Sequence, residues 1–291
     1  MRIDFVVPMV FDDDVMLQHD YRRLFGSPLP RNTRFRSWGT EELLIKCIRK
    51  YMPFVDTIFI LLARESQEKI WMKQEGIKVV YHREFISERF LPCFNSCTIE
   101  MFLPYIDGLS EYFIYGNDDM YPLSPLEESD FFRNNRPCMH FVEKNWPTNP
   151  NIFHRKCMRQ QEIVAKQTHY NCNGMWLHGG HSLAPLRKSL CKEARSCFNE
   201  EVLSGISACR SNTSYNHYLY TLWQYMYGIT IDHAPAMRYT STLDGLDKVL
   251  GCIAEPNVGI LCINDSGGET DFKSFSSAVR QAIEKKLTNN K

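Results

Sequence analysis

The feature of the sequence that most constrains the fold is the alternation of short apolar runs with amphipathic helical segments over residues 1–115. The first run, Ile3–Val10, fits a strand buried on both faces, as the central strands of a parallel sheet are. A polar connection follows, and then a helix that Thr40 can cap and that carries acidic residues in its first turn. Two further apolar runs, Thr57–Leu62 and Ile77–Tyr81, complete a βαβ pattern. This pattern predicts an α/β fold with a mostly parallel, Rossmann-like sheet and flanking helices.

The other elements are expected from the same two periodicities. Residues 133–180 differ, because they are rich in Asn, Pro, Cys and His, and we interpret them as an insertion or cap region within a single α/β domain of residues 1–291. The expected helices are Ser66–Gln74, Ser96–Leu103, Arg155–Lys166, Ala184–Phe198, Ser214–Tyr227 and Phe272–Leu287, and the expected further strands are Glu111–Tyr115 and Val258–Asn264.

The charge balance argues against bulk binding to nucleic acid. The chain has 34 Lys and Arg residues and 34 Asp and Glu residues, so its formal net charge is zero. A protein that neutralises many phosphates usually has a clear excess of basic residues. No apolar run approaches the length of about 18 residues that a membrane-spanning helix needs. We therefore expect no nucleic-acid partner and no transmembrane segment.

The cysteines favour a reducing compartment. All eleven are scattered along the chain without a Cys-x-x-Cys pair, whereas a disulfide framework or a zinc site needs closer grouping. The chain begins on a charged, strand-like stretch with no secretory signal pattern. We therefore expect reduced, mostly buried cysteines and a cytoplasmic protein.

Acidic residues follow three of the expected strands. Asp12 follows the first strand, and Asp265 follows the strand near residue 260. Asp118 and Asp119 come directly after a third strand, with Asn117 before them. Open α/β sheets bind ligands outside the carboxyl ends of their strands, and two adjacent carboxylates there can hold a divalent cation shared with substrate phosphates. Since Asn and Asp also favour turns, a purely structural turn is the alternative.

Three positions offer basic chemistry. His181 follows two glycines in a loop, where an imidazole can act as a general acid or base or bind a phosphate. Arg210 lies in a polar stretch before a helix, and a guanidinium suits bidentate contact with phosphate. Arg34 and Arg36 alternate with aromatic residues and can hold the phosphates and base of a nucleotide. A structural role or exposure to solvent is the alternative for His181, and exposure to solvent is the alternative for the arginines.

Taken together, these segments resemble the Stealth family of sugar-phosphate transferases. This family includes microbial capsular-polysaccharide phosphotransferases and the catalytic part of the animal N-acetylglucosamine-1-phosphotransferase. Within the second segment, the runs Leu91-Pro92-Cys93-Phe94-Asn95-Ser96 and Tyr115-Gly116-Asn117-Asp118-Asp119 stand in the expected order. Four ordered segments carry the resemblance: Ile3–Asp14, Arg34–Phe132, His181–Arg210 with the helix that follows, and Cys262–Asp265.

The resemblance implies a glycosyltransferase-A-like fold and a reaction that moves a sugar-1-phosphate from a nucleotide sugar, expected to be UDP-linked, to a hydroxyl of an oligo- or polysaccharide acceptor. A nucleoside monophosphate is then released. The implied setting is capsule or cell-surface polysaccharide synthesis, in the cytoplasm or peripheral to the inner membrane beside the glycan-assembly machinery. The implied cofactor is Mg²⁺ or Mn²⁺.

The resemblance also implies roles for individual residues, with the general base left open between His181 and an aspartate. The catalytic set is Asp118, Asp119, His181 and Arg210; the donor-binding set is Asp12, Arg34, Arg36, Asn117, Asn264 and Asp265; and the metal ligands are Asp118, Asp119 and Asp265.

Two other functions remain open from the sequence. A conventional metal-dependent glycosyltransferase would use the same acidic pair but release a nucleoside diphosphate. A catalytically weakened relative that binds a glycan or nucleotide is the other option, because Met9-Val10-Phe11-Asp12 stands where relatives usually have Trp-Val-Asp-Gly or Trp-Val-Asn-Gly.

Overall fold

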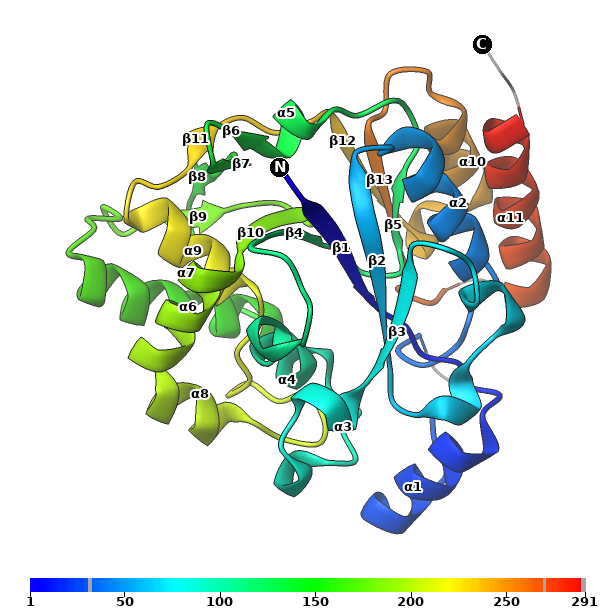
Figure 1. Cartoon of the computed structure of the whole chain (residues 1–291), viewed down its shortest axis with the longest axis horizontal. Helices are drawn as coiled ribbons and strands as arrows, with labels where there is room; N and C mark the ends of the chain where they lie inside the picture. Colours follow the sequence, from blue (N-terminus) through cyan, green and yellow to red (C-terminus); the bar gives the residue numbers. More distant parts are fainter. Residues whose placement is uncertain (31–32, 269–270, 289–291) are drawn as a thin grey trace.

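A five-stranded sheet forms the centre of the computed structural model, which describes residues 1–30, 33–268 and 271–288 (Figure 1). Its strand order is β10-β4-β1-β2-β3; the four strands from β4 to β3 are parallel, and β10 runs antiparallel at one edge. The predicted α/β class with a mostly parallel sheet is therefore confirmed. The strands are β1 (Ile3–Pro8), β2 (Val55–Leu62), β3 (Ile77–Tyr81), β4 (Tyr112–Tyr115) and β10 (Ala184–Arg187).

Both faces of this sheet are buried, which explains why its strands are almost continuously apolar. Because side chains alternate along a strand, Ile58 and Ile60 of β2 enter one hydrophobic core, whereas Phe59 and Leu61 enter the other. Helices α2, α10 and α11 line the first core, and helices α4, α7 and α9 line the second (Figure 1). The α-helices are α1 (Val15–Phe25), α2 (Glu41–Tyr51), α3 (His82–Phe85), α4 (Ser96–Met101), α5 (Glu128–Phe131), α6 (Ile152–Thr168), α7 (Lys188–Cys197), α8 (Asn199–Gly205), α9 (Tyr218–Met226), α10 (Leu246–Ala254) and α11 (Phe272–Thr288).

A second sheet brings the end of the chain beside the residues that follow β4. It has the order β12 (Met237–Ser241), β13 (Ile260–Asn264), β5 (Met120–Pro122), with β13 antiparallel to β5. The backbone N–H of Ile263 donates a hydrogen bond to the carbonyl of Asp119 over 2.9 Å. The acidic pair after β4 is thus held directly against β13.

Residues 133–180 form short strands and one long helix beside the main sheet (Figure 1). Helix α6 packs against α9, with Val164 and Leu222 in the same core. The interpretation of this segment as an insertion in a single domain stays a prediction. The strands of this region are β6 (Phe132–Arg133), β7 (Arg136–Met139), β8 (Val142–Lys144) and β9 (Trp176–His178). The later strand β11 (Ile231–Asp232) pairs with β7.

The predictions of the helices at residues 184–198 and 66–74 were wrong in part. Residues 184–187 form the edge strand β10 before α7 begins, which suits Pro185 because an edge strand tolerates a residue without an N–H. Residues 66–74 form no α-helix but two 3₁₀ turns, Glu65–Gln67 and Ile70–Met72. The side chain of Gln67 is buried and accepts a hydrogen bond from the N–H of Ala63, which fixes the first turn in place.

Five α-helices of the described chain were not expected, namely the short α3, α5 and α8 and the longer α1 and α10. The polar connection before residue 40 contains α1, which Asp14 caps by accepting from the N–H groups of Met16 and Leu17 and which Gly26 ends in the left-handed conformation. Helix α10 lies within a stretch that lacked an expected element. The helices that the structure describes include none long and apolar enough to cross a membrane.

Candidate active site

The strand order places the acidic residues at the point where the sheet changes direction. The chain proceeds from β1 through β2 to β3 on one side and then returns to β4 on the other side of β1. Ligands of open α/β sheets bind at such a switch point, outside the carboxyl ends of the two central strands. The carboxyl end of β4 leads directly into Asn117, Asp118 and Asp119. Gly116 is required before them, because a Cβ there would lie 2.6 Å from Leu183 and 2.9 Å from Phe5.

Asp119 forms a compact group with two side chains that are distant in the sequence. Its Oδ2 lies 3.7 Å from Nε2 of His181 and 3.6 Å from Sγ of Cys262. The ligand atoms of these three residues all lie within 4.8 Å of one another. His181 follows β9 after Gly180, whose φ of 73° few other residues adopt, and Cys262 lies on β13. The structure therefore brings Asp119 and His181 together, and it adds Cys262, to which the sequence had assigned no role.

The electrostatics of the acidic pair favour a cation. Burial raises the pKa of Asp118 to about 8, and the charges of Asp119 and Glu41 contribute to the rise. The Oδ1 atom of Asp119 is buried and accepts no hydrogen bond within the part of the chain that the structure describes. A buried carboxylate oxygen without a partner costs free energy, and a bound cation would remove that cost.

His181 lies where charges of both signs reach it. Burial lowers its pKa, but Asp119 and Glu100 raise it more strongly, so that the net shift is upward. Arg210 opposes this rise, which places its charge within electrostatic reach of His181. The guanidinium of Arg210 donates a hydrogen bond to the hydroxyl of Ser96 at the start of α4. Asp119 and His181 are therefore in contact, and Arg210 acts on the pair from the α4 side.

Glu100, to which the sequence assigned no role, also acts on His181 through its charge. Its side chain is buried, and its Oε2 accepts hydrogen bonds of 2.7 Å from both the backbone N–H and the Nδ1 of His217. These bonds and the charges of His217 and Arg210 lower its pKa in spite of burial, which alone would raise it. The signal available in the sequence was a charged residue on the otherwise uncharged α4 segment.

The expected donor-binding residues near the end of β1 also converge. Asp12 accepts a hydrogen bond of 3.3 Å from the N–H of Ser37. Arg36 binds both carboxylate oxygens of Asp265, over 2.6 and 2.5 Å, and its guanidinium lies 3.8 Å from the centre of the Phe272 ring. Asp265 was expected as a metal ligand, but the structure pairs its carboxylate with Arg36 and leaves it outside the group around Asp119.

Three other predicted donor-binding residues lie on the borders of this region. The side-chain oxygen of Asn117 accepts a hydrogen bond of 2.9 Å from the hydroxyl of Tyr115. Asn264 donates to the hydroxyl of Ser266. The charge of Arg34 opposes the rise in pKa that burial causes in Cys209, the residue before Arg210.

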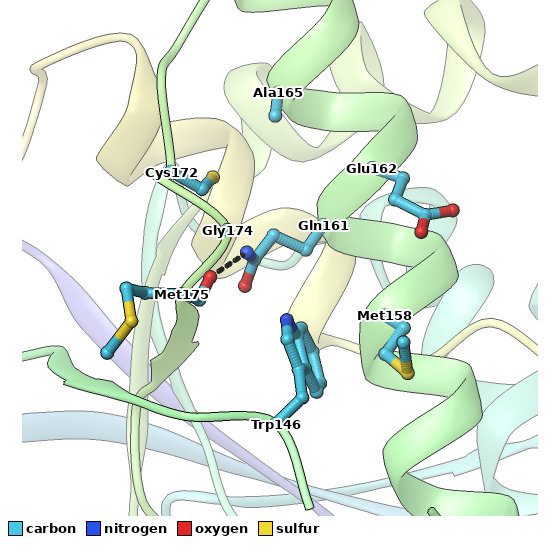
Figure 2. A pocket seen from close by; sticks show the side chains of 8 residues that line it. All are labelled: Trp146, Met158, Gln161, Glu162, Ala165, Cys172, Gly174 and Met175. Atoms are coloured by element: carbon cyan, nitrogen blue, oxygen red, sulfur yellow. Dashed lines mark hydrogen bonds between the residues drawn. The ribbon is translucent and has the colours of Figure 1, made fainter. Parts of the chain in front are cut away.

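A cavity of about 320 Å³ lies apart from these residues, between α6 and the segments around residues 146 and 174 (Figure 2). Figure 2 shows the ring of Trp146 facing Met158 of α6, with Gln161 donating a hydrogen bond of 2.7 Å to the carbonyl of Met175. The cavity is mostly apolar and contains none of the predicted site residues.

Comparisons with known proteins show which family and which enzymes the chain is similar to. Residues 34–139 match the family model described as Stealth protein CR2, conserved region 2. The chain is 34% identical to the capsular polysaccharide phosphotransferase fcs1 of Haemophilus influenzae over 60% of this chain and 50% of that protein. It is 25% identical to WcwK, a capsular polysaccharide phosphotransferase of Streptococcus pneumoniae, over 98% and 96% of the two chains.

Other matches are partial or distant. The alignment with the capsular polysaccharide phosphotransferase LcbA of Neisseria meningitidis has 29% identity and covers 69% of this chain and 58% of LcbA. The chain thus spans only about half the length of fcs1 and LcbA. Among solved structures, the galactosyltransferase LgtC in complex with donor and acceptor sugar analogues aligns over 99% of this chain and 97% of LgtC, with a TM-score of 0.47 and 10% identity.

Proposed function

We propose that this chain is a sugar-phosphate transferase. Residues 34–139 match the model of conserved region 2 of the Stealth proteins, which confirms the predicted resemblance to that family. The proposed enzyme transfers a hexose-1-phosphate or N-acetylhexosamine-1-phosphate from a UDP-linked sugar to a hydroxyl of an oligo- or polysaccharide. The observation that carries the proposal is the contact of Asp119 with His181 beside Asp118, at the switch point of the sheet. The names of the relatives support the setting in capsule synthesis.

The acidic pair fits a divalent cation. Asp118 and Asp119 supply the carboxylate oxygens that Mg²⁺ and Mn²⁺ prefer, and one of these oxygens is buried without a partner. Burial and the charges of Asp119 and Asp118 raise the pKa of Cys262, so this thiol stays neutral and contributes little to binding a hard ion. When bound, the cation would neutralise charge on the two phosphates of the donor.

The residues of the chain then position and deprotonate the acceptor. The acceptor oxygen forms a bond to the phosphorus next to the sugar, and the bond from that phosphorus to the bridging oxygen breaks. The nucleoside monophosphate departs with the bridging oxygen. His181 takes the proton of the acceptor hydroxyl on Nδ1, because its Nε2 faces Asp119. Arg210 stabilises the negative charge that collects on the phosphoryl oxygens.

The test is the identity of the released nucleotide. Purified protein is incubated with a panel of UDP-sugars, Mg²⁺ and candidate acceptors, and the nucleotide products are separated by chromatography. Release of UMP together with a phosphodiester product supports the proposal. Release of UDP would establish a conventional glycosyltransferase, and nucleotide binding without turnover would indicate a weakened relative.

A matched pair of variants connects the activity with the acidic pair. Asp119→Asn removes a charge at the site, whereas Asp13→Asn makes the same change on an exposed side chain after β1. We expect Asp119→Asn to lower the rate of UMP release at least about 100-fold, because it weakens both cation binding and the orientation of His181. Asp13→Asn should keep the rate of the unmodified protein. Equal rates for the two variants would contradict the assignment.

A further inference from the structure

Helix α6 carries a buried ammonium group that contacts no carboxylate of the described residues. Lys156 is only 4% exposed, and its Nζ lies 3.3 Å from Sγ of Cys97. Among the residues that the structure describes, no carboxylate oxygen lies within 4.0 Å of this Nζ. Burial raises the pKa of Cys97, with a contribution from Glu100, so the thiol stays neutral. Within the described part of the chain, Lys156 therefore has no carboxylate in direct contact.

A second cation lies next to Lys156. Arg210 donates a hydrogen bond to the hydroxyl of Ser96, the neighbour of Cys97, and the charges of Arg210 and Lys156 both act on the Cys97 thiol. The nearest acidic group in this environment is Glu100, one turn further along α4. Its carboxylate accepts two hydrogen bonds from His217 and is thereby already engaged. Two positive side chains thus lie at the start of α4, Lys156 against Cys97 and Arg210 against Ser96, and the charge of Arg210 acts on the Glu100 carboxylate.

Such an arrangement destabilises the protein unless a ligand compensates for it. Removing an ammonium from water without a partner costs several kcal/mol, and buried charges are normally paired. The charge of Arg210 also reaches His181, so an anion held by Arg210 lies close to the proposed base. Phosphoryl oxygens are the anions that the proposed reaction brings to this place.

We propose that Lys156 and Arg210 together bind the phosphoryl groups of the nucleotide-sugar donor, with Lys156 supplied by the cap region of residues 133–180. This inference rests on the proposed function, but it concerns a residue outside the four segments that resemble the Stealth family. It gives the cap region a direct part in binding the donor: α6 delivers a charge that the parallel sheet does not provide.

The test measures the binding of inorganic pyrophosphate by calorimetry in the presence of EDTA, so that only side chains contribute. Lys156→Met removes the charge at similar length. Lys166→Met makes the same change at an exposed position on the same helix and serves as the control. We expect Lys156→Met to weaken pyrophosphate binding at least tenfold and to raise the midpoint of thermal unfolding, because the variant no longer buries an unpaired charge. Lys166→Met should change neither quantity.

Two further variants guard against a failure to fold. Lys156→Gln keeps a polar side chain without the charge and should show the same loss of affinity, and Lys156→Arg should retain most of the binding. Pyrophosphate affinity within twofold of the unmodified protein in Lys156→Met or Lys156→Gln would overturn the proposal, as would a lower unfolding midpoint with unchanged affinity. UMP release is assayed separately. If the unmodified protein shows no transferase activity and the Lys156 variants still lose pyrophosphate binding, the result supports the anion site and rejects only the proposed function.

Discussion

Asn95 connects the start of α4 to the loop that carries Arg210, and its replacement by Ala tests how that loop is held. Asn95 is fully buried, and its Oδ1 accepts a hydrogen bond of 3.1 Å from the N–H of Cys97 as the cap of α4. Its amide nitrogen lies 3.2 Å from the carbonyl of Ser207 and 3.3 Å from that of Cys209. Since an amide has two N–H groups, it makes at most two of its possible bonds at once.

The magnitude follows from these contacts. Loss of the cap costs about 1 kcal/mol, and loss of two hydrogen bonds to the loop costs about 2 kcal/mol more, so the total is about 3 kcal/mol. Because Cys209 precedes Arg210, the freed loop also misplaces the guanidinium, and kcat/KM for nucleotide release should fall about tenfold or more.

Urea denaturation and the nucleotide-release assay measure the two effects. Asn151→Ala is the matched control, because Asn151 caps α6 through the N–H of His154 over 3.0 Å and is exposed. We expect that control to lose only about 1 kcal/mol and to keep its activity. Equal losses of stability in Asn95→Ala and Asn151→Ala would refute the claim that Asn95 anchors the loop.

Three further predictions concern pH, the Arg36 pair and the metal. Burial lowers the pKa of His82 to about 4 from an unfolded value of about 6.5, so the unfolded chain binds the extra proton first. The contribution of neutral His82 to the free energy of unfolding should be fully present above pH 6.5, and about 3 kcal/mol of it should be lost as the pH falls to 4. In His82→Leu the free energy of unfolding should depend less steeply on pH over this range, and an unchanged slope would disprove the role of His82. Asp265→Asn removes the carboxylate charge that Arg36 binds and should raise KM for the nucleotide sugar several-fold; an unaltered KM would show that this ion pair is not part of the donor site. Treatment with EDTA should abolish nucleotide release, and Mg²⁺ or Mn²⁺ should restore it; an undiminished rate in EDTA would contradict the metal assignment.

The main sheet could be predicted from the sequence because its strands are buried on both faces. The run Ile77–Tyr81 matches β3 residue for residue, although β3 is an edge strand in which only Val80 is buried, because its β-branched and aromatic residues favour a strand. Residues 184–187 were harder, because a short edge strand before a helix has the same apolar content as the first turn of that helix. Helix α1 was missed although Asp14 and Gly26 mark its ends, because most of its apolar side chains are exposed and only Leu17 and Tyr21 among them are buried.

Some residues of the candidate site could likewise be predicted from the sequence, and others could not. Asp118 and Asp119 were recognisable because they follow a strand, and His181 because it follows two glycines. Cys262, Glu100 and Lys156 were not, since each gains its importance from a neighbour more than 50 residues away in the chain. The pairing of Asp265 with Arg36 depends on a separation of 229 residues, which no local pattern reveals.

The hydrogen bond from Ile263 to Asp119 has a consequence for the order of events during synthesis on the ribosome. The parallel sheet and the acidic pair can form early, but Asp119 obtains its neighbour Cys262 only after a further 143 residues have emerged. Contacts of such long sequence separation form late in folding, because the loop between them must first be closed. Nascent chains that stop short of β13 should therefore be inactive, and catalytic competence should arise in one step near the end of translation.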